Sequence, residues 1–344
     1  MKIVSGAALA GFVAFGVLAL GGCSSPGANS SSTGNTASRD VTVPEPDAAM
    51  NPANAKQLRI AVIPKGLSHA FWQSVKRGAE DAGREMNAQI IWNGPQSEGQ
   101  GVTQQVSIVE DQVTKKVDGI VLAPIDQTAL VQAIDKAAGQ KIPVAIIDSD
   151  AKTKNRISFV ATDNYKGGVL AAQRMIEIIG GKGKVGMVPV QANSQSTEDR
   201  ERGFTDTVKK APGIKLVRSQ YGQSDRTVSM NAAQDMLTAN PDIVAIFGPN
   251  ESSAVGSLSA VRNRNLIGKL KIVGFDSAPV LVQALKSGDI DSLVVQNPYK
   301  MGYEGVKAIV NKANGQSVQP RVDTGVVLVS KANMNTPDNQ KLLQ

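Results

Sequence analysis

Short apolar runs of strand length alternate with amphipathic stretches of helix length along most of the chain, and this alternation limits the possible folds more than any other feature. The runs are rich in β-branched residues and show no polar–apolar alternation, which is typical of parallel strands buried on both faces. We expect strands at Leu58–Pro64, Ala88–Trp92, Gly119–Ala123, Val144–Asp148, Ser158–Ala161, Lys184–Pro189, Lys215–Val217, Ile243–Gly248, Lys271–Phe275 and Ser292–Gln296. We expect helices at Phe71–Glu85, Gln104–Lys116, Ala129–Gln140, Tyr165–Ile179, Glu198–Lys210, Thr227–Leu237, Ser252–Arg262, Val280–Ser287 and Met301–Asn311. This order predicts an α/β fold with doubly wound sheets.

The two halves of the chain contain similar sequence patterns. The run Val117–Pro124 has a counterpart in Pro241–Pro249, and each is followed by a helix and then by a strand that ends in an aspartate, Asp148 or Asp276. One explanation is the general likeness of all strand–helix units. The other is a pair of similar lobes that present polar residues at the carboxyl ends of their strands, where open α/β sheets bind ligands. Two such lobes facing each other would form a cleft.

The N-terminus has the pattern of an export signal. Lys2 precedes an apolar run over Ile3–Leu20, and small residues lead to the single cysteine of the chain in Leu20-Gly21-Gly22-Cys23. An uncleaved transmembrane anchor is the alternative, because the run approaches spanning length. The tetrad resembles the lipobox of bacterial lipoproteins, which implies a signal peptide over residues 1–22 and a lipid on the Cys23 thiol. We expect an exported lipoprotein, periplasmic or at the cell surface, that meets the membrane through this lipid only.

Residues 23–56 are rich in Ser, Asn, Thr, Gly, Pro and Ala and contain almost no large apolar side chains. Such a segment cannot bury enough surface to offset its ordering entropy, so we expect a flexible tether. The formal net charge of +7 is spread along the chain without a basic block. We therefore expect no binding to nucleic acid.

The composition and motifs argue against catalysis and against bound metals. One Cys and one His exclude an internal disulfide and any zinc centre built from several Cys or His ligands. The segment Gly181–Gly186 matches Gly-x-Gly-x-x-Gly, but it follows a predicted helix and opens a predicted strand, whereas a dinucleotide loop requires the opposite order. The sequence contains no nucleophile elbow and no phosphate-binding loop. We expect a monomeric protein that is not an enzyme and needs no cofactor or metal.

Planar hydrogen-bonding side chains stand at the ends of the predicted strands and at the start of one helix. They are Asp148, Asn250, Asp276, Gln296 and Arg200. Carboxylate, amide and guanidinium groups can each engage two neighbouring hydroxyls, which a sugar or polyol offers. The pair Phe71-Trp72 at a helix start could pack on the apolar face of a sugar ring or in the protein core.

From Leu58 to about Ser330 the chain resembles the periplasmic sugar-binding proteins of the ribose-binding family, the solute receptors of ABC importers. The stretches that carry the resemblance are Ile60–Pro64, Phe71-Trp72, Pro143–Asp148, Ala161–Asn164, Arg200 with Gly203-Phe204, Phe247–Asn250, Val273–Asp276 and Gln296. The resemblance implies a type I periplasmic binding protein fold, in which two doubly wound parallel-sheet lobes are joined by a three-crossover hinge. It divides the chain into an N-terminal lobe of residues 57–161 and 297–323 and a C-terminal lobe of residues 162–296 and 324–344. It also implies an ABC importer permease as partner.

Carried over position by position, the resemblance assigns ligand contacts to Phe71, Trp72, Asp148, Arg200, Asn250, Asp276 and Gln296, with weaker contacts at Thr162 and Phe275. Two positions depart from the family pattern. Ser224 stands where the family has a second stacking Phe, and Ala123 replaces an amide. Stacking from the second side and one polar contact are therefore in doubt.

Lys65 and His69 depart from the ribose pattern in the first loop. Pro64-Lys65 and Asn93-Gly94-Pro95 resemble the autoinducer-2 receptor branch, in which the lysine contacts ligand. Lys65 could instead be a solvated loop charge, and His69 a capping or rim residue. Two ionisable donors at the cleft would favour a ligand with a carbonyl, a carboxylate or a furanose-like oxygen cluster.

Three other functions are consistent with parts of this pattern. A sensor that presents ligand to a chemoreceptor or kinase has the same fold and the same site. A secreted carbohydrate enzyme could use Asp148 and Asp276 as acid and base, but we expect their neighbours to keep both ionised, which a general acid cannot be. The export signal argues against a repressor core.

Overall fold

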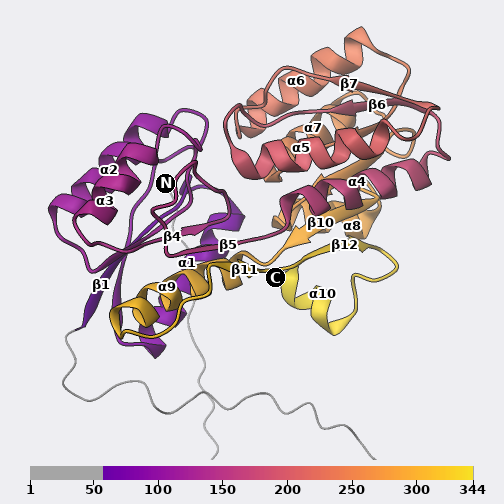
Figure 1. Ribbon diagram of the computed structural model, residues 1–344. Helices are drawn as coiled ribbons and strands as arrows, with labels where there is room; N and C mark the ends of the chain where they lie inside the picture. Colours follow the sequence, from indigo (N-terminus) through magenta and orange to yellow (C-terminus); the bar gives the residue numbers. More distant parts are fainter. Residues whose placement is uncertain (1–56, 344) are drawn as a thin grey trace, which may run out of the picture. The chain divides into compact units, whose positions relative to one another are not determined.

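Two six-stranded sheets form the framework of residues 57–343, the part of the chain that this computed structural model describes (Figure 1). The first sheet contains β1 (Leu58–Ile63), β2 (Ala88–Trp92), β3 (Gly119–Leu122), β4 (Val144–Ile147), β5 (Ser158–Ala161) and β11 (Arg321–Asp323). Its spatial order is β11-β5-β4-β3-β1-β2, and all its pairings are parallel. The predicted signal peptide, the lipidated Cys23 and the tether lie outside the described residues.

The second sheet has the order β12-β10-β9-β8-β6-β7. Its strands are β6 (Gly183–Met187), β7 (Ile214–Arg218), β8 (Ile243–Phe247), β9 (Lys271–Phe275), β10 (Ser292–Gln296) and β12 (Val326–Ser330). The second sheet is parallel, as expected, except at one edge, where β12 pairs antiparallel with β10. The chain enters β12 directly from β11 in the first sheet, without the long crossover connection that would return it in the parallel direction.

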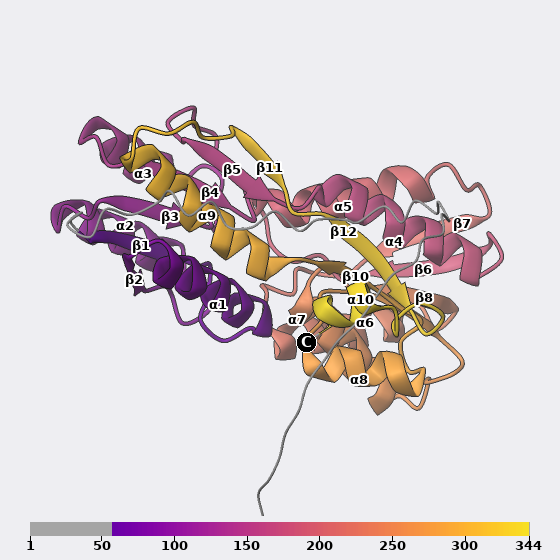
Figure 2. The ribbon, with the colours of Figure 1, turned by 90° about the horizontal axis from the view of Figure 1, so that it is seen from below.

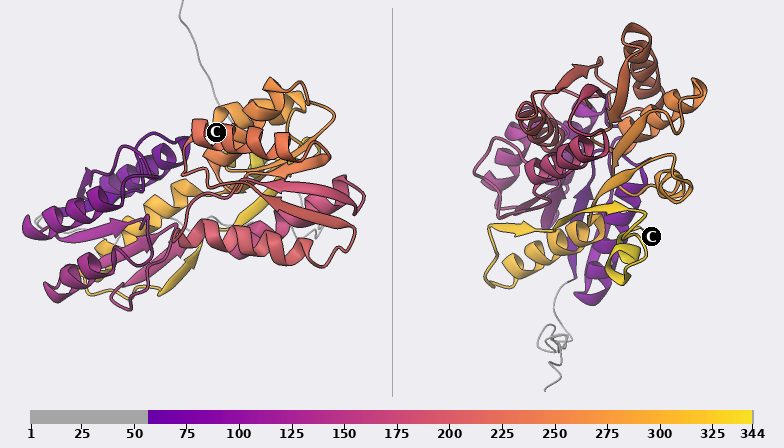
Figure 3. Two further views of the ribbon diagram at one scale, coloured as in Figure 1. Left: turned by 90° about the horizontal axis from the view of Figure 1, so that it is seen from above. Right: turned by 90° about the vertical axis from the view of Figure 1, so that its right-hand side faces the viewer.

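Helices cover both faces of each sheet, as expected for a doubly wound fold (Figure 3). On the first sheet, α1 (Ala70–Glu85) and α9 (Pro298–Ala313) pack in one apolar cluster, and α2 (Val102–Thr114) and α3 (Val131–Gly139) pack in the other. On the second sheet, α4 (Asn164–Ile178) and α5 (Gln195–Val208) cover one face. The other face is covered by α6 (Arg226–Ala239), α7 (Glu251–Asn263) and α8 (Pro279–Ser287), near the final helix α10 (Pro337–Leu342).

The chain passes between the two sheets at three points. It leaves β5 of the first sheet for α4, leaves β10 of the second sheet for α9, and runs from β11 directly into β12 (Figure 2). These three crossovers agree with the type I periplasmic binding protein fold.

Helix α9 returns from the second sheet and lies against α1 with almost no space between the two backbones (Figure 2). A Cβ atom added at Gly302 of α9 would lie 2.0 Å from the carbonyl oxygen of Val75, and one added at Gly78 of α1 would lie 2.0 Å from that of Tyr299. This close contact leaves no room for a side chain on either glycine. No helix within residues 57–343 is long and apolar enough to span a membrane.

Candidate functional site

The two aspartates at the strand ends share an unusual backbone conformation. Asp148 follows β4 and Asp276 follows β9, and their φ angles are 60° and 72°. Left-handed backbone is uncommon outside glycine, although Asp and Asn tolerate it, and such residues are concentrated at functional sites. The conformation turns the chain at the carboxyl edge of each sheet and places one carboxylate there.

These carboxylates line one cavity between the two lobes. Its lining residues are Lys65, His69, Phe71, Trp72, Glu98, Asp148, Ser196, Thr197, Arg200, Asn250, Glu251, Asp276 and Gln296. Nine of the eleven residues expected from the sequence are among them. The cavity volume is about 30 Å³, enough for one or two water molecules. Side chains from the two lobes therefore nearly fill the space between them.

Lys65 is buried in this cavity and holds the first aspartate. Its Nζ lies 2.8 Å from Oδ2 of Asp148, and both side chains are less than 5% exposed. The same nitrogen donates hydrogen bonds to the hydroxyls of Ser196 and Ser194 on the opposite lobe, at 3.0 and 3.3 Å. The alternative that Lys65 is a solvated loop charge is therefore wrong. Arg200 approaches the other oxygen of Asp148 at 3.8 Å.

His69 and Glu98 form a second buried pair. Nδ1 of His69 lies 3.0 Å from Oε1 of Glu98, and this oxygen also accepts the indole N–H of Trp72 at 2.6 Å. On the other side, Nε2 of His69 lies 3.0 Å from the hydroxyl of Ser252, which itself donates to the carbonyl of Ser224. Both ring nitrogens therefore act as donors, which requires the imidazolium form.

The pKa values of this pair agree with the geometry. Burial alone would lower the pKa of His69, but the hydrogen bond and charge of Glu98 and the charge of Glu251 outweigh it and raise the pKa to about 9. Burial alone would raise the pKa of Glu98, but His69, Lys65 and Trp72 outweigh it and lower the pKa to about 2. The pair is charged at neutral pH.

Asp276 is held within the second lobe. Its Oδ1 accepts from Nε2 of Gln296 at 2.7 Å, and its Oδ2 accepts from the backbone N–H of Glu251 at 2.9 Å. Burial raises its pKa to about 6, against the opposing effects of Arg200 and Gln296. The expectation that neighbours keep this carboxylate ionised therefore holds above about pH 6 and fails below it.

Ser224 joins the two lobes through hydrogen bonds. Its hydroxyl donates to Oε2 of Glu98 and accepts from Nδ2 of Asn250, each at 2.9 Å. The second stacking Phe of the family pattern is thus replaced by a polar link between the lobes.

The charges in the cavity are balanced. Lys65 pairs with Asp148, and His69 pairs with Glu98. Arg200 also faces Asp148, while Glu251 pairs with Arg226 at 2.5 Å. Lys65 and His69 were expected to favour a ligand with a carbonyl, a carboxylate or a furanose-like oxygen cluster; because each already pairs with a carboxylate of the protein, a carboxylate is the least supported of the three. Such a set favours an uncharged, hydroxyl-rich ligand.

Thr162 and Phe275 are absent from the cavity lining. The hydroxyl of Thr162 lies within hydrogen-bonding distance of Thr324 and of the carbonyl of Gly325, at the crossover between β11 and β12. Phe275 is fully buried, and the guanidinium of Arg200 lies 4.0 Å from its ring centroid. Thr162 thus contacts the hinge, and Phe275 supports Arg200 from behind.

Four lining residues were not predicted from the sequence: Glu98, Ser196, Thr197 and Glu251. Glu98 lies in the loop after β2, and Ser196 and Thr197 lie in the first turn of α5. Unlike Asp148 and Asp276, none of these residues comes directly after a strand, since β2 ends at Trp92 and β6 at Met187. The strand-end signal therefore could not have indicated them, and serine and threonine are too common at helix starts to stand out.

Comparisons with known proteins agree with this architecture. A family model described as the periplasmic binding protein domain matches residues 60–317. The D-allose-binding periplasmic protein of Escherichia coli is 32% identical over 268 residues, which cover 76% of this chain and 86% of that relative. The ribose import binding protein of Bacillus subtilis is 28% identical over 279 residues, covering 81% and 89%.

Solved structures give the same result. A carbohydrate transporter solute-binding protein of Agrobacterium radiobacter, in complex with D-arabinose, aligns with a TM-score of 0.81 and 38% identity and covers 84% of this chain and 99% of that one. An ABC transporter solute-binding protein of Agrobacterium vitis with bound D-fucose has the same TM-score and identity and covers 83% and 100%.

Proposed function

This chain belongs to the periplasmic binding protein family, among relatives of the ribose-binding type, and we propose that it captures a sugar or polyol, of which an uncharged, hydroxyl-rich part lies between the lobes, and delivers it to an ABC importer. The observation that carries this proposal is the charge-balanced cavity that receives one strand-end aspartate from each sheet. The names of the relatives describe binding and import and not catalysis.

Hydroxyl groups of the protein link the lobes across this cavity and indicate how a ligand would bind. Ser196 accepts from Lys65, Ser224 donates to Glu98, and Ser252 accepts from His69. In each case a hydroxyl of the second lobe meets an ionised group of the first. Hydroxyls of a sugar would take these places once the lobes separate.

Closure around a ligand then follows from desolvation. Buried ionised groups without partners cost several kcal/mol, so closure is favourable only when hydroxyls satisfy both lobes together. A ligand that contacts both lobes shifts the equilibrium toward the closed form by its differential affinity. The importer would recognise that closed form.

The membrane attachment is part of the proposal. The lipid on Cys23 would hold the receptor at the membrane, and the tether of residues 23–56 would let the lobes reach the permease. The Cys23→Ser variant should appear in the soluble fraction, whereas the wild type should appear in the membrane fraction. Its affinity for ligand should be unchanged. Retention of the variant in the membrane fraction would contradict lipidation.

A thermal-shift screen tests the binding function. The panel contains pentoses, hexoses, polyols, one-ring sugar acids and autoinducer-2. A tight ligand at 100 times its dissociation constant adds about 2.7 kcal/mol to the free energy of unfolding. We expect a neutral sugar or polyol to produce this shift in the wild type and not in Asp276→Ala. The proposal fails if no neutral compound stabilises the protein.

The autoinducer-2 receptor function is a second candidate. The observation in its favour is the position of Lys65 within the cavity lining. A shift with autoinducer-2 and with no sugar would select it. A sensing role with a chemoreceptor or kinase shares the same site, and loss of uptake on deletion of the cognate permease would favour the importer.

A further inference from the structure

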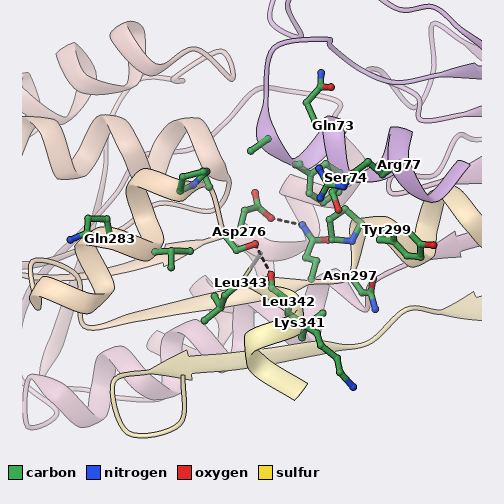
Figure 4. A pocket seen from close by; sticks show the side chains of 18 of the residues that line it. Gln73, Ser74, Arg77, Asp276, Gln283, Asn297, Tyr299, Lys341, Leu342 and Leu343 are labelled. Carbon is green, nitrogen blue, oxygen red and sulfur yellow. Dashed lines mark hydrogen bonds between the residues drawn. The ribbon is translucent and has the colours of Figure 1, made fainter. Parts of the chain in front are cut away.

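A second and larger cavity lies where β10 leads into α9, and Figure 4 shows the residues that line it. Its volume is about 430 Å³. Its walls are the first two turns of α1, one side of α8, the first turn of α9 and the end of α10, and we call it the hinge cavity. Helix α1 packs on the first sheet, whereas α8 packs on the second. A molecule in the hinge cavity would therefore contact both lobes.

The two cavities share a wall of three residues: Phe71, Asp276 and Gln296. Gln296 is 2% exposed; its Nε2 donates to Asp276, but its Oε1 has no hydrogen-bond partner. A buried acceptor without a donor costs about 1–3 kcal/mol, so such atoms generally mark a missing partner. An amide oxygen requires a donor, and a ligand hydroxyl at the junction of the cavities supplies one.

The hinge cavity differs from the first cavity in charge. Arg77, Lys286 and Lys341 contribute three cations to its lining, and Asp276 is the only acid among the lining residues. Both oxygens of Asp276 already accept hydrogen bonds from the protein. Phe71 and Tyr299 add aromatic faces to the walls. The hinge cavity thus combines an anion-attracting rim with surfaces on which a ring can pack.

We propose, resting on the sugar-binding function above, that the ligand is an acidic two-ring sugar. Its uncharged ring lies among Asp148, Arg200 and Asp276. A hydroxyl near the linkage donates to Oε1 of Gln296, and the second ring lies in the hinge cavity with its carboxylate toward Arg77 and Lys286. The ligand class is a neutral sugar joined to a uronic acid, an aldobiouronic acid.

Calorimetry with matched sugars tests this inference. Each monosaccharide that binds is compared with disaccharides in which D-glucuronic acid is joined to each of its hydroxyls in turn, and with the corresponding neutral D-glucose disaccharides. We expect at least one acidic disaccharide to bind about tenfold or more tightly than its monosaccharide and more tightly than its neutral counterpart. If the monosaccharide binds at least as tightly as every acidic disaccharide, the inference is overturned and the sugar-binding function stands. If no sugar of any kind binds, the proposed function itself fails.

Charge-reversed variants locate the second ring. In Arg77→Glu/Lys286→Glu, the ratio of acidic-disaccharide affinity to monosaccharide affinity should fall to about 1. The matched control is Lys154→Glu/Lys269→Glu, which changes the net charge equally at exposed residues outside the cavity lining and should preserve the ratio. Equal ratios in both variants would show that the acidic ring binds elsewhere and would overturn the assignment to the hinge cavity.

Discussion

The ammonium of Lys65 lies 2.8 Å from a carboxylate oxygen of Asp148, in an ion pair that is almost fully shielded from solvent. Removing one member of a buried pair leaves the other charge uncompensated, which costs about 3–5 kcal/mol. We expect Lys65→Met to lower the free energy of unfolding, measured in urea, by about 3 kcal/mol. The loss is near the lower end of that range because the guanidinium of Arg200 still lies 3.8 Å from Asp148 and partly compensates its charge. The control is Lys115→Ala, which breaks an exposed pair with Asp111 and should cost less than about 1 kcal/mol. Equal losses would contradict the burial argument.

The second aspartate should make ligand binding depend on pH. Asp276→Ala is expected to weaken sugar binding by about 2–5 kcal/mol in calorimetry, since it removes a buried charged acceptor. Because burial raises the pKa of Asp276 to about 6, affinity in the wild type should fall as the pH drops through 6. Asp276→Asn should bind weakly and show no such change. A wild-type affinity that is constant from about pH 7.5 to about pH 5 would remove Asp276 from the site.

His69 should make stability depend on pH in the alkaline range. Its pKa is higher in the folded protein, about 9, than the ordinary value of 6.5. Its protonation therefore stabilises the fold fully below about pH 6.5, and this contribution is lost as the pH rises through about 9. We expect the stability difference between wild type and His69→Gln, measured by urea unfolding, to shrink across this range. A difference that stays constant between these pH values would mean that the imidazole is not charged in the fold.

The contact between α1 and α9 should tolerate no added methyl group. Gly302→Ala would place Cβ 2.0 Å from a backbone oxygen of Val75, so the helices must separate. We expect a loss of about 1–3 kcal/mol, the usual cost of overpacking. Gly139→Ala is the control, because a Cβ there meets no atom within 4 Å and should stabilise the protein by about 0.5–1 kcal/mol. A neutral Gly302→Ala would show that α9 can shift freely.

Periodicity predicted most of the fold. The bounds of the predicted strands and helices agree with the structure within three residues. The edge strands β11 and β12 were missed. Strand β11 spans three residues, two of them charged and exposed, so its pairing with β5 leaves no apolar signal in the sequence. Strand β12 is only half-buried. Its antiparallel direction follows from the crossover that precedes it, and a local sequence pattern does not encode that direction.

The site was predictable where a side chain follows a buried strand and not where packing decides its role. Asp148 and Asp276 were found because their strands end in a polar residue at the binding edge. Phe275 precedes Asp276 in sequence, but strand geometry turns its ring into the core, beneath Arg200. The ion pairs of Lys65 and His69 depend on partners 83 and 29 residues away, so the sequence indicated neither that Lys65 pairs with Asp148 nor that His69 pairs with Glu98.

The pairing of Lys65 and His69 with buried carboxylates has a consequence for an exported protein, which must work at whatever salinity its surroundings impose. Dissolved ions screen the interactions between solvent-exposed charges, but they have little effect on ion pairs that are buried away from solvent. Capture of an uncharged ring in this cleft would proceed equally well in dilute and in saline water.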